Sequence, residues 1–101
     1  MIRTFVLTFS IVCFLFVTIS YAERGVVVER NYEKYVISYS YGYLLVEWYG
    51  GYTPLEGDEY VGEFSNYGME KLYCLNSERN TEFWIEEYMA DEEEAIRFLY
   101  E

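Results

Sequence analysis

The sequence has no histidine, one proline, two cysteines and few basic residues. Without histidine, the chain lacks the commonest general base and the commonest metal ligand. This excludes Ser/His/Asp and Cys/His nucleophile systems and leaves too few of the usual ligands for zinc. Seven Lys and Arg against 18 Asp and Glu give a net charge of -11. That charge argues against nucleic acid and against anionic lipid as partners, because both attract a basic surplus.

Disorder is excluded as well, because 52% of the residues are apolar and 22% are aromatic. A length of 101 residues allows one domain and leaves no room for a separate catalytic domain.

The first 22 residues have the layout of a secretory signal peptide. Arg3 supplies a charged start, residues 4–19 are strongly apolar, and Ser20 and Ala22 are small residues at the positions before a cut. We therefore predict cleavage after Ala22 and a secreted or periplasmic location. The alternative is a retained membrane anchor, since residues 4–22 are uncharged and approach the ~20 residues that a spanning helix needs.

The mature chain would be a single small β-rich domain, residues 23–101. Cleavage removes Arg3 as its only charged residue, so the net charge changes from -11 to -12. Only Cys74 remains, which rules out an internal disulfide, so the domain must rely on its core. No histidine or basic cluster lies near Cys74 to lower its pKa, and we expect it to be a buried, unpaired hydrophobe.

The mature chain is dominated by strand patterns, which are rich in β-branched and aromatic residues. About six strands are expected, at residues 25–30, 35–40, 43–49, 58–64, 70–75 and 81–89. Gly42 can take the positive φ of a tight hairpin. The spacing predicts a mainly β fold: a small antiparallel barrel of SH3-like or OB-like type, or alternatively a curled sheet, with one C-terminal helix.

The helix is expected to begin near Asp91. Asp91 fits an N-cap, and Glu94 three residues later fits a capping box. Ala95, Phe98 and Leu99 would share the face that lies on the sheet, by their i, i+3, i+4 spacing.

Tyrosine is the most unusual residue, with 13 in the chain. If strands 35–40 and 43–49 pair as a hairpin, a row of Tyr rings could span both. Such rings either fill a core or form an aromatic platform for a sugar, a peptide or another protein. The candidate binding residues are Tyr39, Tyr41, Tyr43, Glu47, Tyr49 and Tyr52.

The remaining motifs give no catalytic residue, metal site or cofactor. The glycines of loop 50–58 permit either close approach to a ligand or simply a bend, and no phosphate-loop ending is present. Neither 56–59 nor 91–94 has calcium-loop spacing, so both are interpreted as solvated charge or capping. A glycosidase pair cannot be assigned by counting carboxylates.

One stretch resembles a group of small secreted bacterial proteins without an assigned function. The resemblance covers roughly residues 35–100. It is carried by the run YSYGYLLVEWYGG at 39–51, then Pro54, Gly57-Asp58, Gly62-Glu63-Phe64, Tyr67-Gly68 and the acidic helix. It implies a bacterial, exported protein and supplies no site residues.

The expected function is therefore an exported, non-enzymatic, acidic binding domain with a Tyr-rich surface. Its partner would be a protein or glycan that is basic or neutral, with no nucleic acid and no membrane after cleavage. Two alternatives stay open: an inhibitor of a basic secreted enzyme, and a small carboxylate-dependent glycan hydrolase.

Overall fold

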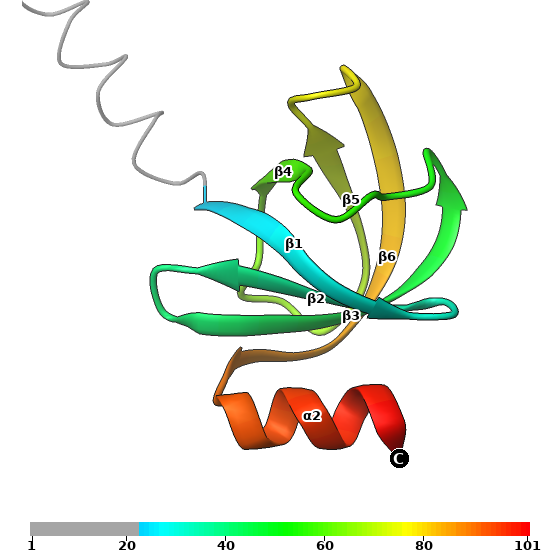
Figure 1. Cartoon of the computed structure of the whole chain (residues 1–101). Helices are drawn as coiled ribbons and strands as arrows, with labels where there is room; N and C mark the ends of the chain where they lie inside the picture. Colours follow the sequence, from blue (N-terminus) through cyan, green and yellow to red (C-terminus); the bar gives the residue numbers. More distant parts are fainter. Residues whose placement is uncertain (1–22) are drawn as a thin grey trace, which may run out of the picture.

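A computed structural model describes residues 23–101, and the predicted signal peptide lies outside this range. The described chain forms six strands followed by one helix (Figure 1). In chain order they are β1 (Glu23–Asn31), β2 (Lys34–Tyr39), β3 (Gly42–Gly51), β4 (Glu59–Gly62), β5 (Gly68–Cys74), β6 (Arg79–Ala90) and α2 (Glu92–Tyr100).

The strands close into a barrel in the order β1-β2-β3-β6-β5-β4, and all neighbouring strands are antiparallel. The chain thus makes two three-stranded meanders, β1–β3 and β4–β6, which join where β3 pairs with β6 and where β1 pairs with β4. Both edges of each meander are paired, so the structure is the closed barrel of the sequence prediction and not the curled sheet. The mainly β class and the single C-terminal helix are confirmed.

Gly42 begins β3 directly after the tight turn from β2, as predicted. Its φ is +131°, a conformation that L side chains rarely adopt. A Cβ at this position would also lie 2.7 Å from the carbonyl oxygen of Ala90 on β6. Glycine is therefore needed here twice, for the turn and for the close approach of the neighbouring strand.

The barrel interior is filled by alternate residues of the strands. Phe83 of β6 is fully buried and contacts two tyrosine rings edge-on, with centroids 6.2 Å from Tyr35 and 5.3 Å from Tyr60. Cys74 is buried in the same cluster as a free thiol, as predicted. The cluster consists of Val27, Tyr35, Ile37, Leu44, Val46, Tyr60, Phe64, Leu72, Cys74, Phe83 and Ile85.

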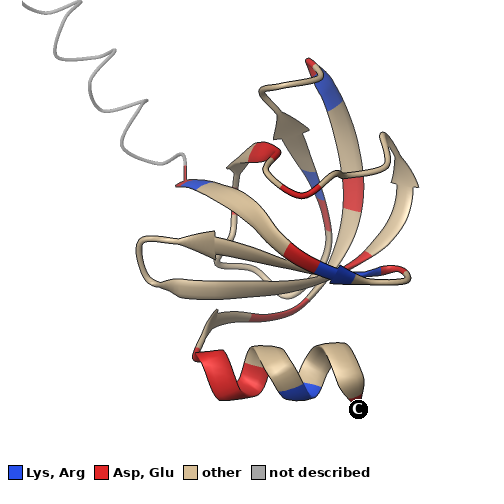
Figure 2. Cartoon of the chain, in the orientation of Figure 1, with Lys and Arg blue, Asp and Glu red and all other residues tan. Residues whose placement is uncertain are grey.

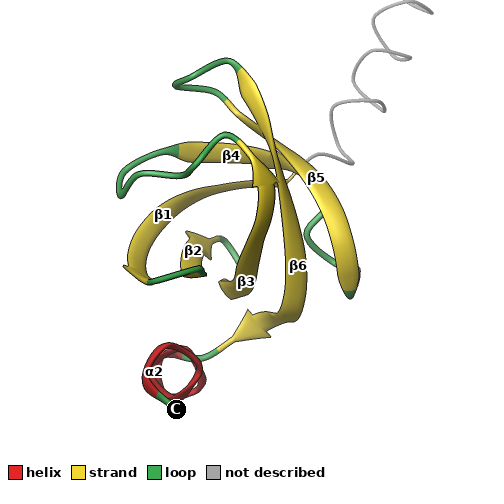
Figure 3. Ribbon diagram, turned by 90° about the vertical axis from the view of Figure 1, so that its right-hand side faces the viewer, coloured by secondary structure: helices red, strands yellow, loops and turns green. Residues whose placement is uncertain are grey.

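Helix α2 lies outside the barrel wall (Figure 3) and forms a second apolar cluster. Ala95 and Leu99 are buried against Val36 of β2 and Leu45 of β3, and Phe98 packs beside them. The outer face of β2 and β3 is therefore apolar where the helix covers it, which confirms the predicted helix face.

Both ends of α2 are capped. At its start the predicted capping box is present: the Asp91 carboxylate accepts from the Glu94 amide at 2.8 Å, and the Glu94 carboxylate accepts from the Asp91 amide at 3.4 Å. At its end, carbonyl oxygens that have no partner within the helix accept from side chains of the β1–β2 hairpin. Asn31 Nδ2 donates to the Leu99 oxygen at 2.6 Å, and Lys34 Nζ donates to the Phe98 oxygen at 3.0 Å.

A short hydrogen-bond chain lies inside one end of the barrel. Thr81 Oγ1 donates to the Tyr52 carbonyl at 2.8 Å and lies 2.6 Å from the Tyr60 hydroxyl. Thr81 has a single hydroxyl proton, which is used toward Tyr52, so Tyr60 must be the donor to Thr81. The buried Tyr60 hydroxyl is therefore held in its protonated form.

The buried hydrogen bond from Tyr60 to Thr81 leads us to expect that the protein loses stability at high pH. Burial raises the pKa of Tyr60 above its usual value of 10.0. Below pH 10 the folded and unfolded chains both keep this proton; above it only the unfolded chain loses it, so the stability falls as pH rises. We expect the difference in unfolding free energy between the wild type and Tyr60→Phe to shrink from pH 9 to pH 11 in urea titrations. A difference that stays constant over this range would contradict the assignment.

Candidate binding surfaces

The predicted row of tyrosines across β2 and β3 does not form, and this expectation was wrong. In the observed register Tyr35 pairs with Val46 and Ser38 pairs with Tyr43. Directly paired residues of an antiparallel sheet share a face. Tyr35 therefore points into the barrel, while Tyr43 lies on the outside beside α2. The two sets of rings are separated by the barrel wall.

Of the tyrosines next to the β2–β3 turn, Tyr39 has a structural role. Its ring packs edge-on against Phe64 at 5.2 Å and against Tyr41 at 6.1 Å. Its hydroxyl accepts from the Met89 amide at 2.9 Å, which ties the turn to the end of β6. Tyr41 is exposed in the turn itself.

Tyr52 is likewise occupied within the fold. Its hydroxyl donates to Asp58 Oδ2 at 2.8 Å, and the Leu55 amide donates to the same oxygen at 2.9 Å. The hydrogen bond to Asp58 raises the pKa of Tyr52. Its carbonyl accepts from Trp48 Nε1 at 3.2 Å as well as from Thr81. Loop 50–58 is thus folded onto the barrel, with its glycines serving the bend.

Two other predicted residues, Tyr49 and Glu47, lie on the outer face of β3, where they meet residues that the sequence analysis did not select. The Tyr49 ring lies 6.4 Å from the ring of Trp84 on β6, tilted by 36°. Trp84 is in register with Glu47 on one side and with Met69 of β5 on the other. Tyr49, Trp84 and Met69 are 57%, 40% and 47% exposed. We call these three residues the outer aromatic patch.

Trp84 could have been found from the sequence by alternation. Thr81, Phe83 and Ile85 of β6 are buried, so the residues between them must face outward. An outward-facing Trp is large enough to define a contact surface.

Carboxylates outnumber basic residues around the outer aromatic patch. Glu47 is its neighbour on β3, and Glu82 and Glu86 lie two residues before and after Trp84 on the same outer side of β6. Two lysines are in register with these carboxylates: Lys71 of β5 with Glu82, and Lys34 of β2 with Glu47. Figure 2 shows the acidic residues spread over the barrel and gathered at the start of α2, with few basic residues among them. The patch is therefore apolar in the middle, and its border carries three carboxylates and two lysines, which leaves a net negative charge.

Fluorescence quenching should detect this negative border. A cationic quencher is concentrated near Trp84, and an anionic one is repelled, when the local potential is negative. We expect the ratio of caesium to iodide quenching of Trp84 to exceed that of free N-acetyltryptophanamide by about twofold at low salt. The Trp84→Phe variant retains only the half-buried Trp48, so its fluorescence is measured separately and subtracted from that of the wild type. A ratio equal to that of the free compound would contradict a negative potential at the patch.

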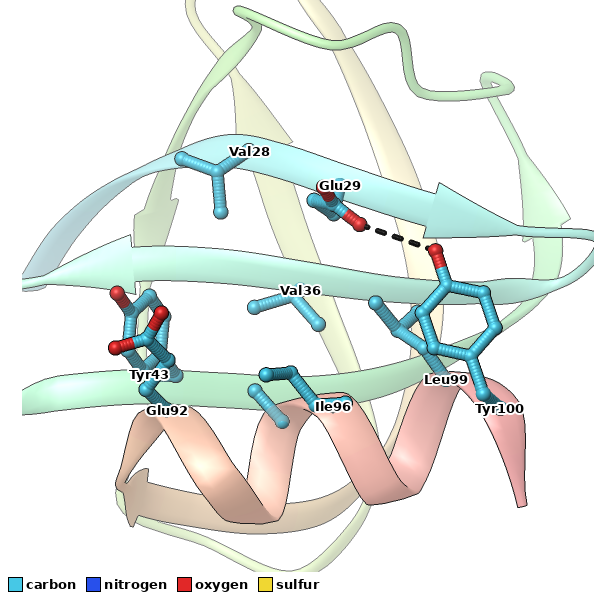
Figure 4. A pocket seen from close by; sticks show the side chains of 9 residues that line it. Val28, Glu29, Val36, Tyr43, Glu92, Ile96, Leu99 and Tyr100 are labelled. Atoms are coloured by element: carbon cyan, nitrogen blue, oxygen red, sulfur yellow. Dashed lines mark hydrogen bonds between the residues drawn. The ribbon is translucent and has the colours of Figure 1, made fainter.

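The second surface feature is a groove between α2 and strands β1 and β2 (Figure 4). Its volume is about 520 Å³, which is within the range of small-ligand sites. Val36, Ala95 and Leu99 supply a buried apolar floor, and the exposed side chains of Val28 and Ile96 flank it. Tyr43, another predicted residue, lines this groove rather than a tyrosine platform.

Metal-binding clusters and membrane-spanning helices are both absent from the described part of the chain. Within residues 23–101, no group of three His, Cys, Asp or Glu side chains is placed to hold a metal ion. Over the same residues, no helix has the length and apolar character needed to cross a membrane. Comparison with protein-family models, with curated proteins and with solved structures finds no match. The functional argument therefore depends on the two surfaces themselves.

Proposed function

We propose that this chain is an exported, non-enzymatic binding domain that contacts a basic or neutral partner through its outer aromatic patch. The observation that carries the proposal is the exposed Tyr49–Trp84 pair inside a border with more carboxylates than lysines. Tryptophan and tyrosine are the residues most enriched among the energetic centres of protein interfaces. An exposed pair on a rigid sheet is available for such contact without rearrangement of the backbone.

The charge selects the class of partner. With a net charge of -12 after the predicted cleavage, the domain attracts cationic molecules over long range and repels anionic ones. Arginine or lysine side chains would interact with Glu47, Glu82 and Glu86, and they can also stack on the Trp84 and Tyr49 rings. A basic protein, or a neutral glycan that stacks on the rings, fits this surface.

The location of this function follows from the N-terminal segment. The charged start, apolar middle and small residues before Glu23 support export. The resemblance over residues 35–100 supports a bacterial protein of the periplasm or the culture medium.

The test uses the domain of residues 23–101 as bait against envelope and culture-medium fractions, at about 0.05 M and about 0.5 M salt. The captured partner is then titrated against the wild type, Trp84→Ala, Tyr49→Ala and Tyr32→Ala. Tyr32 is an exposed turn tyrosine outside the patch and is the matched control. We expect Trp84→Ala to weaken binding by about tenfold or more and Tyr32→Ala to leave it unchanged.

Two results would overturn the proposal. One is a partner that binds the Trp84→Ala variant as tightly as the wild type. The other is tight, salt-independent binding of an acidic partner such as DNA.

Inhibition of a basic secreted enzyme is the form of this function that the acidic border favours, since opposite charge speeds association with such a target. The assay is direct: lysozyme, as a basic probe enzyme, is incubated with the wild type and with Trp84→Ala. Loss of its activity with the wild type alone would establish inhibition through the patch.

A further inference from the structure

The groove between α2 and strands β1 and β2 has an apolar middle and an acidic group at each end. Glu92, at the start of α2, lies beside Tyr43 at one end (Figure 4). Glu29 of β1 is in register with Val36, and its Oε2 reaches toward the other end, where it accepts from the Tyr100 hydroxyl at 3.4 Å (Figure 4). None of the described residues that line the groove is basic. Each end can therefore bind a cationic group.

Exposed apolar side chains make the middle of the groove suitable for contact. Val28 and Ile96 are 40% and 54% exposed, and Val36 and Leu99 form the floor beneath them. Covering such side chains with an apolar group contributes about 25 cal/mol for each Å² removed from water.

The length of the groove along α2 restricts the length of the occupant. Glu92 and Tyr100 are eight residues apart on one helix, which corresponds to about 12 Å. In an extended peptide, residues i and i+4 are about 13 Å apart, and residues i, i+2 and i+4 point to the same side. A five-residue segment therefore matches the groove, with its middle side chain over the apolar floor.

Charge excludes other apolar occupants of the groove. A second copy of this chain would bring its own strongly negative surface to two carboxylates. A fatty acid or an anionic lipid would be repelled for the same reason.

We propose that this groove binds an extended segment of a partner polypeptide with the pattern basic–x–apolar–x–basic. The apolar side chain covers Val36 and Leu99, and the two basic side chains pair with Glu29 and Glu92. The inference rests on the proposed function, because it assigns the basic partner a second contact, separate from the outer aromatic patch.

The probe is the peptide acetyl-Lys-Ser-Leu-Ser-Lys-amide, titrated into isotopically labelled domain and followed by NMR. Amide shifts should be confined to β1, β2 and α2 around the groove. The Leu→Gly peptide, which has the same charge, should bind about tenfold more weakly. Glu29→Gln and Glu92→Gln should each weaken binding about three- to fivefold, and the double variant about tenfold.

Glu93→Gln is the matched control, because Glu93 lies in the same first turn of α2 but outside the groove lining. It should leave the affinity unchanged, and circular dichroism verifies that each variant keeps the helix. The proposal is overturned if the Gly peptide binds as well as the Leu peptide, or if the double variant binds like the wild type. It is also overturned if the shifts map to the outer aromatic patch.

Trp84→Ala separates this inference from the proposed function. It should not change the affinity for the peptide in the groove titration, whereas it should weaken binding of the captured partner. If Trp84→Ala weakens binding of the peptide and the groove variants do not, the groove proposal is overturned. The proposed role of the outer aromatic patch is then unaffected.

Discussion

Replacing Phe83 by alanine should lower the free energy of unfolding by about 3–5 kcal/mol. Phe83 is fully buried at the centre of the barrel, between the rings of Tyr35 and Tyr60. Truncation removes two edge-on aromatic contacts and leaves a cavity that the closed barrel cannot collapse to fill. Since small domains are stable by only about 5–15 kcal/mol, this loss is a large share of the total. Urea unfolding followed by circular dichroism measures it.

The adjacent residue is a sharp control for this prediction. Trp84 is larger than Phe83 but points outward and is 40% exposed. Trp84→Ala should therefore cost less than about 1 kcal/mol of stability, in the range of ordinary surface changes, while it weakens binding. Equal destabilisation by the two variants would mean that the inward and outward faces of β6 are wrongly assigned.

Leu99→Ala should have the second largest effect, about 2–4 kcal/mol, but on a different unit of the structure. Leu99 is buried between α2 and the outer face of β2 and β3, apart from the barrel core. A helix of nine residues does not persist without its packing surface. We therefore expect α2 to detach while the barrel stays folded.

Hydrogen exchange tests that separation. In Leu99→Ala the amides of residues 92–100 should exchange faster, while those of β6 inside the barrel keep their protection. Ile96→Ala is the control on the same helix, because Ile96 is 54% exposed and its truncation leaves little cavity. A uniform loss of protection across the barrel would show that α2 and the barrel unfold as one unit.

The sequence predicted the features that depend on local chemistry. Runs of β-branched and aromatic residues indicated the strands, and Asp91 with Glu94 marked the start of α2, because a capping box is complete within one turn. Gly42 marked its hairpin for the same local reason. Cys74 could be assigned to the core because it shares a strand face with Leu72 and no second cysteine remains to pair with it.

Features that depend on how strands meet were not predictable in the same way. The row of tyrosines required Tyr39 and Tyr43 to share a face, and the register places them on opposite sides of the barrel wall. A one-residue change in register moves every side chain to the other face, and no local pattern fixes that choice here. The contact between Tyr49 and Trp84, and the groove between α2 and strands β1 and β2, likewise form between elements that are distant in the chain.

The arrangement of the barrel as two meanders also determines how fast the chain can fold. Within each meander the strands are joined by short turns, so their pairing requires only small loops to close. The two seams, β3 with β6 and β1 with β4, join residues that are far apart in the chain. Such distant pairing slows folding to the range of about milliseconds to seconds. Closure of the seams, rather than formation of either meander, should therefore be the rate-limiting step, and α2 can dock only after β2 and β3 present their outer face.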